Sequence, residues 1–265
     1  MAFKKQKLLI VGIDSAIARK LISNPILKDF EIHGTSRRVL DHKNNKNLYH
    51  LDLSSDKIDS LKGFFDFAVI CAGETNIKNC EDFYDKARQI NVDSTIKLIS
   101  NLLSQGTFVL FLSSNAVFDG SKAFCTPADL RNPINSYGKF KLEVENYLSA
   151  QQAPSSVLRL TKLVAPDYGL LAEWNRNLGN YLEIKAYTDK LISPIGFEET
   201  TKSIISILNS RSTGVFHLGG KEEMSYYEFA RVQFKNISGA LHLITPVISM
   251  ETNRGKFNSL STYLP

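Results

Sequence analysis

The stretch Lys7-Leu8-Leu9-Ile10-Val11-Gly12-Ile13-Asp14-Ser15-Ala16-Ile17-Ala18 decides the fold of this chain. Residues 7–11 form an unbroken apolar run of strand length, which is typical of a strand buried on both faces of a parallel sheet. Residues 12–18 then occupy the turn from that strand into a helix. Small residues at such a turn let backbone N–H groups approach a pyrophosphate, so the stretch predicts a dinucleotide-binding site.

The turn carries only one of the three glycines of the extended pattern Gly-x-x-Gly-x-x-Gly. Ser15 and Ala18 stand at the other two positions. The motif is therefore degenerate, and it supports cofactor binding only in combination with other features of the chain.

Apolar strand-like runs alternate with helical segments through the first 160 residues. This alternation predicts an α/β protein with a Rossmann-type, doubly wound parallel sheet. Beyond Val164 the segments become shorter, so we expect an NADP-binding Rossmann domain at residues 1–164 and a small C-terminal substrate-binding lobe at residues 165–265, with segments that return to the first domain. The polar end, about residues 252–265, is expected to be poorly ordered. The expected strands are residues 7–11, 31–36, 48–52, 67–73, 108–114, 156–160 and 214–218. The expected helices cover residues 80–103 and 197–208, a segment opened by residues 135–141 and another that begins at the cap Ser225.

Residues at the carboxyl ends of these strands are candidates for cofactor binding, because ligands of open α/β sheets bind there. After the second strand, Arg37 and Arg38 stand where an NAD site favours a carboxylate. Two guanidinium groups would instead accept a 2′-phosphate, at about 1.5–3 kcal/mol for each charge-assisted hydrogen bond. NADP is therefore favoured over NAD, by roughly ten-fold to a hundred-fold; two solvated arginines on a loop are the alternative. The cofactor candidates at these strand ends are Gly12, Asp14, Ser15, Ala16, Ile17, Thr35, Ser36, Arg37, Arg38, Asp52, Leu53, Cys71, Ala72, Gly73 and Ser113.

Tyr137 and Lys141 lie four residues apart at the start of a predicted helix, so both side chains leave the same face. A phenol beside a cation ionises more easily, which suits Tyr137 for proton exchange with a substrate oxygen. The pair also arises by chance on exposed helix faces. Its position about two dozen residues after the strand end Ser113-Ser114 favours the catalytic interpretation.

Charge and composition restrict the classes of ligand and partner that the chain is expected to bind. The formal net charge of +5 is spread along the 265 residues without a basic run, which suits an anionic ligand and argues against nucleic acid. The apolar run near the N-terminus is too short for a signal peptide or a membrane span, so a cytoplasmic location without membrane contact is expected. Three cysteines, Cys71, Cys80 and Cys125, without paired spacing predict neither a disulfide framework nor a metal site.

Several motifs in order resemble the extended short-chain dehydrogenase/reductase family, and within it the dTDP-4-dehydrorhamnose reductase branch. The most specific is Ser113-Ser114-Asn115-Ala116-Val117-Phe118-Asp119-Gly120, which is similar to that of sugar-nucleotide 4-keto reductases. The others are the Gly12 turn, Cys71-Ala72-Gly73, Ile90-Asn91-Val92-Asp93, Tyr137-Gly138-Lys139-Phe140-Lys141-Leu142-Glu143, Leu158-Arg159-Leu160-Thr161 and Gly214-Val215-Phe216-His217-Leu218.

The resemblance implies an NADP(H)-dependent reductase of a 4-keto-6-deoxyhexose nucleotide. Tyr137 would donate the proton, Lys141 would hold the nicotinamide ribose and lower the pKa of Tyr137, and Ser114 would bind the ketone oxygen. Asn91, Leu160 and Thr161 would lie beside the cofactor. Candidates for contact with the sugar nucleotide are Asn175, Arg176, Lys190 and Ser193.

Departures from the family pattern keep other functions open. Asn115-Ala116 stands where the dehydratase branch has an acid pair, which argues against dehydration. A sugar-nucleotide 4-epimerase would use the same three catalytic residues. The degenerate glycine turn leaves room for a non-catalytic member, either a regulatory protein similar to the regulatory subunit of methionine adenosyltransferase or an NADP-sensing binder. The helical segments 80–103 and 137–148 suggest a possible homodimer.

Overall fold

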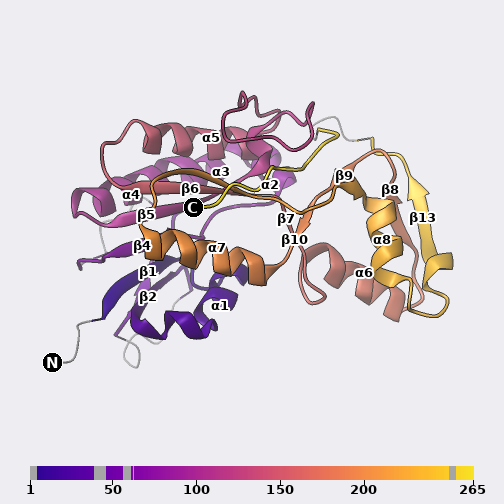
Figure 1. Ribbon diagram of the computed structural model, residues 1–265, viewed down its shortest axis with the longest axis horizontal. Helices are drawn as coiled ribbons and strands as arrows, with labels where there is room; N and C mark the ends of the chain where they lie inside the picture. The colour runs from indigo at the N-terminus through magenta and orange to yellow at the C-terminus, as the bar shows by residue number, and fades with distance from the viewer. Residues whose placement is uncertain (1–4, 39–45, 56–60, 62, 251–254) are drawn as a thin grey trace.

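A parallel seven-stranded sheet forms the centre of the computed structural model, which describes residues 5–38, 46–55, 61, 63–250 and 255–265 (Figure 1). The strand order is β11-β6-β5-β4-β1-β2-β3, so the chain reverses direction across the sheet between β1 and β4. This arrangement confirms the predicted Rossmann-type fold. The strands are β1 (Gln6–Val11), β2 (Phe30–Ser36), β3 (Leu48–His50), β4 (Phe67–Ile70), β5 (Phe108–Ser114), β6 (Ser155–Leu160) and β11 (Gly214–Leu218).

Helices cover both faces of the sheet because its central strands are apolar on both sides. One core joins the sheet to α1 (Ala16–Ile22) and α7 (Phe197–Ser210). The other joins it to α4 (Ser94–Ser104) and α5 (Ser136–Ser149). In Figure 1 these two pairs lie on opposite sides of the sheet.

The expected helix over residues 80–103 is divided into several pieces. The chain forms α2 (Ile77–Asp82) and α3 (Tyr84–Arg88), which are separated by Phe83 with non-helical dihedral angles. A π-helical turn, Gln89–Asp93, then leads into α4. The prediction of a long helical stretch is thus confirmed over residues 84–103, with a π-helical turn inside it, and it is wrong only at Phe83, where the helix is interrupted.

A smaller lobe stands at one end of the sheet (Figure 1). Its core packs Trp174 of α6 (Gly169–Gly179) against Phe229 and Phe234 of α8 (Tyr226–Phe234). The chain does not stay in this lobe, because α7 and β11 return to the main sheet. The lobe and its junction also contain β7 (Lys162–Leu163), β8 (Ile184–Tyr187), β9 (Leu191–Ile192), β10 (Pro194–Ile195), β12 (Met224–Ser225) and β13 (Ile244–Val247).

The end of the chain is ordered where the structure describes it. Residues 255–265 run from the small lobe back along the main domain (Figure 1), and Ser259 and Leu260 are only 2% and 1% exposed. Backbone hydrogen bonds link Tyr263 to His217 and the segment near Leu260 to Cys125. The expectation of poor order is thus wrong for residues 255–265, since burial and backbone pairing outweigh their polar composition; residues 252–254 lie outside the described residues.

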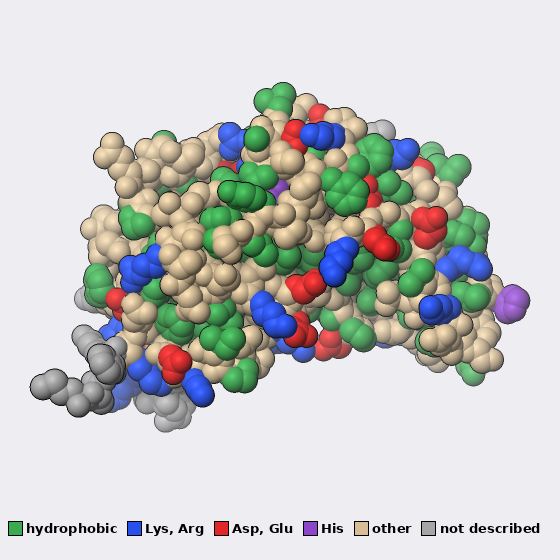
Figure 2. Space-filling model, in the orientation of Figure 1, with side chains coloured by type: hydrophobic (Ala, Val, Ile, Leu, Met, Phe, Trp, Pro, Cys, Tyr) green, Lys and Arg blue, Asp and Glu red, His purple; other side chains and the backbone are tan. Residues whose placement is uncertain are grey.

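The surface is mixed in charge. On the face shown in Figure 2, basic and acidic side chains are interspersed among hydrophobic and uncharged ones. Among the described residues, no helix is both long enough and apolar enough to cross a membrane.

Candidate functional site

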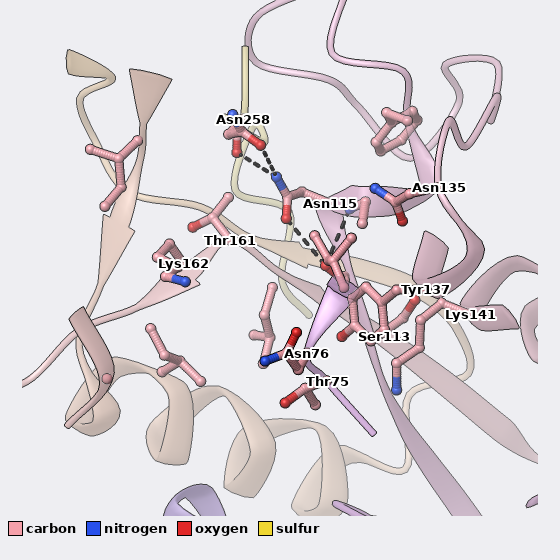
Figure 3. Close-up of a pocket in the computed structure, with 18 of the residues that line it drawn as sticks. Thr75, Asn76, Ser113, Asn115, Asn135, Tyr137, Lys141, Thr161, Lys162 and Asn258 are labelled. Atoms are coloured by element: carbon pink, nitrogen blue, oxygen red, sulfur yellow. Dashed lines mark hydrogen bonds between the residues drawn. The ribbon is translucent and has the colours of Figure 1, made fainter. Parts of the chain in front are cut away.

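A cavity of about 450 Å³ opens beyond the carboxyl ends of the central strands, where the sheet faces the small lobe. Figure 3 shows side chains from both parts of the molecule around it. The predicted site residues that line the cavity are Ile17, Cys71, Ala72, Ser113, Ser114, Tyr137, Lys141, Leu160, Thr161 and Lys190. The structure thus brings Ser114, Tyr137 and Lys141 together in one cavity, as the sequence predicted.

Close packing of α5 on the loop after β5 brings Tyr137 beside Ser114. Asn135 caps α5, with its Oδ1 accepting from the backbone N–H of Gly138 at 2.8 Å. A Cβ atom at Gly138 would lie 2.0 Å from the carbonyl oxygen of Ala116, so only glycine permits this approach. The Ser114 hydroxyl group is then close enough to Tyr137 to oppose part of the rise in the pKa of the phenol.

Lys141 is buried below these two hydroxyl groups, at 7% exposure. Its Nζ donates to the carbonyl oxygen of Leu112 at 2.9 Å and lies 4.5 Å from the ring centroid of Phe111. Burial lowers the pKa of Lys141 to about 8, and the negative charge of Glu145 opposes this shift. The buried ammonium group therefore loses its proton more readily than an exposed lysine does.

The pKa of Tyr137 differs from the sequence-based expectation. Burial raises it to about 12, and the neighbouring Ser114 hydroxyl group offsets only part of this effect. The Nζ of Lys141 lies 5.7 Å from the centroid of the Tyr137 ring, but it does not lower the pKa of the phenol below its ordinary value. The expectation of a lowered pKa is wrong for this state, because the cost of a buried phenolate dominates.

A buried charge cluster supports the site from behind. Glu145 and Arg159, each 1% exposed, form a bidentate ion pair with N···O distances of 3.0 and 2.7 Å. Ser113 donates to Oε1 of Glu145 at 2.6 Å, so its hydroxyl group faces this cluster. Arg159 also contacts Nε2 of His217 at 3.1 Å; burial is the main cause that lowers the pKa of His217 to about 4, and the imidazole is neutral.

The sequence-based reasoning missed Glu145, although a signal was present. Tyr137, Lys141 and Glu145 follow one another at intervals of four on α5 and therefore share one face. Arg159 could not be paired with Glu145 from the sequence, because they meet only when α5 packs on the sheet.

On the cofactor side, predicted residues build the turn after β1. Gly12 has φ +84°, and a Cβ there would lie 2.8 Å from the Cβ of Ala72, so the turn and the end of β4 touch. Thr35 accepts at 3.1 Å from the N–H of Gly12. The Ser36 hydroxyl group donates to Asp14. Thr35, Ser36 and Asp14 thus support the shape of the turn rather than lining the cavity.

The helix that follows this turn begins with a side-chain cap. Ser15 accepts from the backbone N–H of Ala18 at 3.2 Å, and Ala16 begins α1. Ile17 is the residue of this helix that lines the cavity. A helix start at the β1–α1 turn is where backbone N–H groups can meet a pyrophosphate, although the N–H of Ala18 already donates to Ser15.

Arg37 and Arg38 follow β2 directly and are exposed, away from the cavity. Asp52 lies near Arg37, and its pKa is lowered mainly by hydrogen bonds from Ser54, with a smaller contribution from Arg37. Leu53 is buried in the apolar core, so its side chain has a packing role. The structure leaves the two guanidinium groups accessible at the edge where a 2′-phosphate would lie in this fold.

Asn91 and Gly73 form one local unit beside the cavity. The Asn91 side chain accepts at 2.9 Å from the N–H of Glu74 and donates at 3.0 Å to the Glu74 carbonyl oxygen. Its Oδ1 would lie 2.8 Å from a Cβ at position 73. Asn91 therefore fixes the loop after β4, and the adjoining Cys71 and Ala72 line the cavity.

Thr161 has a buried hydroxyl group beside the cavity that a ligand could bind. It lines the cavity beside Leu160, it is 6% exposed, and its Oγ1 lacks any hydrogen-bond partner among the described residues. A buried hydroxyl group without a partner costs about 1–3 kcal/mol, so a ligand that bonds to it would recover this energy. With the glycine turn, this orphan atom makes the residues present compatible with a dinucleotide.

Several lining residues escaped the sequence-based reasoning, and others that it proposed lie elsewhere. Asn175 and Ser193 donate to the carbonyl oxygens of Pro166 and Gly220, and Arg176 is exposed outside the cavity lining. Residues of the small lobe and the tail were missed because they carry no local motif, whereas Asn115 and Phe118 belong to the quoted motif but were not named as site residues. The additional polar and aromatic residues that line the cavity are Thr75, Asn76, Asn115, Phe118, Asn135, Lys162, Tyr168, Tyr187, Tyr226, Phe257 and Asn258.

Comparison with curated proteins finds two kinds of relative. The beta subunit of methionine adenosyltransferase 2 from Bos taurus is 28% identical over 176 residues, which cover 61% of this chain and 52% of that protein. A dTDP-4-dehydrorhamnose reductase from Sinorhizobium fredii is 29% identical over 180 residues, which cover 64% of this chain and 60% of that protein. The aligned region thus spans about half of the first relative and less than two thirds of the second.

Solved structures extend the similarity to the whole fold. A dTDP-4-dehydrorhamnose reductase from Clostridium acetobutylicum superposes with a TM-score of 0.82 at 26% identity, covering 97% of this chain and 91% of that one. A dTDP-4-dehydrorhamnose reductase from Bacillus anthracis, solved in complex with NADP, has a TM-score of 0.83 over 98% of this chain and 91% of that one. At 19% identity the second match shows the fold alone.

The family model described as RmlD substrate binding domain matches residues 6–259, which is nearly the whole chain. The fold, the order of the motifs and this match agree, and the chain belongs to the RmlD substrate binding domain family within the extended short-chain dehydrogenase/reductases.

Proposed function

We propose that this protein is an NADP(H)-dependent reductase of a keto-sugar nucleotide, with Tyr137 as the proton donor. The observation that carries the proposal is the convergence of Ser114, Tyr137 and Lys141 on one cavity. Relatives named dTDP-4-dehydrorhamnose reductase support the reaction class and a 4-keto-6-deoxyhexose substrate.

The charge of the cavity supports an anionic substrate. Lys141, Lys162 and Lys190 line it, whereas none of its described lining residues is an aspartate or glutamate. The diphosphate of a sugar nucleotide suits such a surface. The same composition argues against a dehydratase, because elimination of water needs an acid and a base beside the sugar.

The residues divide the work of ketone reduction among them. When bound, the reduced nicotinamide supplies the hydride that reaches the carbonyl carbon. Tyr137 gives its proton to the carbonyl oxygen, and its raised pKa keeps it protonated at neutral pH. The Ser114 hydroxyl group, which donates to Oδ1 of Asn115 at 3.2 Å in the structure, would turn to donate to the same ketone oxygen as negative charge develops. Lys141 holds positive charge below Tyr137 and would bind the nicotinamide ribose.

Replacement of Tyr137 by Phe tests the proposal. A screen of 4-keto-6-deoxyhexoses linked to dTDP, UDP and GDP, followed by NADPH absorbance, first identifies the substrate. Tyr137→Phe is then expected to lower kcat by about 10²–10⁴, with NADPH affinity unchanged. Survival of turnover within about two-fold would rule out this mechanism, and absence of turnover on every sugar would rule out the activity.

A regulatory role is the second candidate, favoured by the relatives named as beta subunits of methionine adenosyltransferase 2. In that case the protein would bind a catalytic partner and turn over no keto sugar. Size-exclusion chromatography of the protein with a purified methionine adenosyltransferase catalytic subunit from the same organism would separate the two roles. Co-elution without ketone reduction would favour the regulatory role.

A further inference from the structure

The described end of the chain connects the small lobe to the catalytic serine. Asn258 lies on this segment, where the backbone N–H groups of Asn258 and Ser259 both donate to Oε1 of Glu223, at 2.6 and 2.8 Å. The segment is also paired with β9, since the N–H of Leu191 donates to the carbonyl oxygen of Lys256. Asn258 is therefore held from the side of the small lobe.

The side chains of Asn258 and Asn115 form a chain of hydrogen bonds from the tail to Ser114. Asn258 donates through Nδ2 to the carbonyl oxygen of Leu191 at 3.0 Å, which turns its Oδ1 away from β9. Asn115 donates through Nδ2 to both the backbone oxygen and Oδ1 of Asn258, at 3.0 and 3.1 Å. Figure 3 shows these contacts between the tail and the loop after β5.

The orientation of the Asn115 amide determines whether its oxygen or its nitrogen faces the Ser114 hydroxyl group. With Nδ2 directed at Asn258, Oδ1 of Asn115 faces Ser114 and accepts its hydroxyl proton at 3.2 Å. The Ser114 oxygen also accepts from the N–H of Ala116 at 3.2 Å. Ser114 is thus fixed from two sides, and one of them depends on the tail.

We propose that Asn115 and Asn258 are positioning residues that set the orientation of the Ser114 hydroxyl and tie it to the docked tail and the small lobe. The catalytic part of this inference rests on the proposed reductase function. Its structural part does not, because the link can be measured without turnover. An amide suits both positions, because its nitrogen only donates and its oxygen only accepts, so each group matches one of these partners, whereas an aspartate at either position could only accept.

Hydrogen–deuterium exchange of the full-length protein tests the structural part. The Ala116 amide reports on Ser114, because Ser114 Oγ accepts its proton. In Asn258→Ala we expect this amide to exchange about ten-fold faster, since the support of Asn115 is weakened. In Asn115→Asp, an acceptor replaces the donor that faces two oxygens of Asn258, and we expect faster exchange in residues 256–260 by a similar factor of about ten.

A matched control removes another side-chain bond of the tail. Ser261 donates to the carbonyl oxygen of Phe124 at 2.8 Å and has no contact with Asn115 among the described bonds. Ser261→Ala should leave the exchange of the Ala116 amide and all kinetic constants unchanged. Equal acceleration at Ala116 in this variant would mean that any loosening of the tail has the same effect, and it would overturn the proposal.

Kinetics test the catalytic part. If the wild-type enzyme reduces a keto-sugar nucleotide, Asn115→Asp should lower kcat by about ten-fold or more, because small errors of position are costly, while KM for NADPH stays the same. Asn258→Ala should act in the same direction, and the double variant should lose less than the product of the single effects. Unchanged kcat in both single variants would overturn the positioning role.

The two proposals can fail separately. A wild-type protein without turnover would end the reductase proposal, and the exchange of the Ala116 amide in Asn258→Ala would still decide the link. Unchanged exchange at Ala116 in that variant would overturn the link even in an active reductase.

Discussion

Gly138 lies directly against the carbonyl oxygen of Ala116, so near that a Cβ atom at position 138 would be 2.0 Å from it. This contact sets the distance between α5 and the loop that carries Ser114. Tyr137, the neighbour of Gly138, reaches Ser114 only because the helix comes this close.

Gly138→Ala should therefore separate Tyr137 from Ser114. The carbonyl oxygen of Ala116 belongs to the backbone and cannot move away easily from an added Cβ atom. We therefore expect a loss of about 1–3 kcal/mol in the free energy of unfolding and a fall in turnover of about ten-fold or more. Urea unfolding and steady-state kinetics measure the two effects. Gly179→Ala is the matched control, since a Cβ there meets no atom within 4 Å; equal behaviour of the two variants would contradict the packing argument.

Glu145→Gln should destabilise the protein strongly. The substitution preserves size but leaves Arg159 buried without its counter-charge, which typically costs about 3–5 kcal/mol. Urea unfolding at neutral pH measures the change. Glu198→Gln removes one partner of an exposed ion pair with Lys202 and should barely alter stability. A Glu145 variant as stable as this control would show that the buried pair contributes little.

The arginines after β2 are expected to select NADPH. The double substitution of Arg37 and Arg38 by Ala should weaken NADPH binding by roughly ten-fold to a hundred-fold and leave NADH binding unchanged. Fluorescence titration of each nucleotide measures the dissociation constants. Arg231→Ala, an exposed change on α8, is the control, and an equal loss for NADH and NADPH would refute recognition of the 2′-phosphate.

Thr161→Val should have opposite effects on the empty and the cofactor-bound protein. Removal of the unpartnered Oγ1 relieves a buried polar group, so the unfolding free energy without ligand should rise by about 1 kcal/mol. Nucleotide affinity should fall because the bond to the ligand is lost. Thr161→Ser keeps the hydroxyl group and should bind the nucleotide as the wild type does. Weaker nucleotide binding by Thr161→Ser but not by Thr161→Val would exclude a hydrogen-bonding role of the hydroxyl group.

The pH dependence of reduction should report Lys141. Its pKa of about 8 lies below the usual value, so the ammonium form is present below pH 8 and is lost as the pH rises through 8. Tyr137, with a pKa of about 12, stays protonated over the same range. We expect kcat/KM to fall above about pH 8, since this constant reflects the free enzyme.

Lys141→Arg provides the control for this profile. Arginine does not titrate in this range, so any remaining activity should lose the alkaline fall near pH 8. Persistence of the same fall in that variant would assign the titration to another group.

The sequence alone determined the sheet and predicted that Ser114, Tyr137 and Lys141 would lie together. The apolar run before Gly12 and the similar apolar runs later in the chain predict buried parallel strands, because a strand buried on both faces consists of consecutive apolar residues. Tyr137 and Lys141 share a face through helical spacing, and Ser114 ends a strand at the edge where such sheets bind ligands.

Tertiary structure decided what depends on contacts between distant segments. Burial of Tyr137 raised its pKa where the sequence suggested a lowered one, because desolvation depends on everything that packs around the phenol. Glu145 and Arg159 form an ion pair only because α5 packs on the sheet. The tail packs against the main domain, and Asn258 therefore contacts Asn115, which lies 143 residues earlier in the sequence. No local pattern encodes such pairings, since they exist only after the sheet, the helices and the small lobe have assembled.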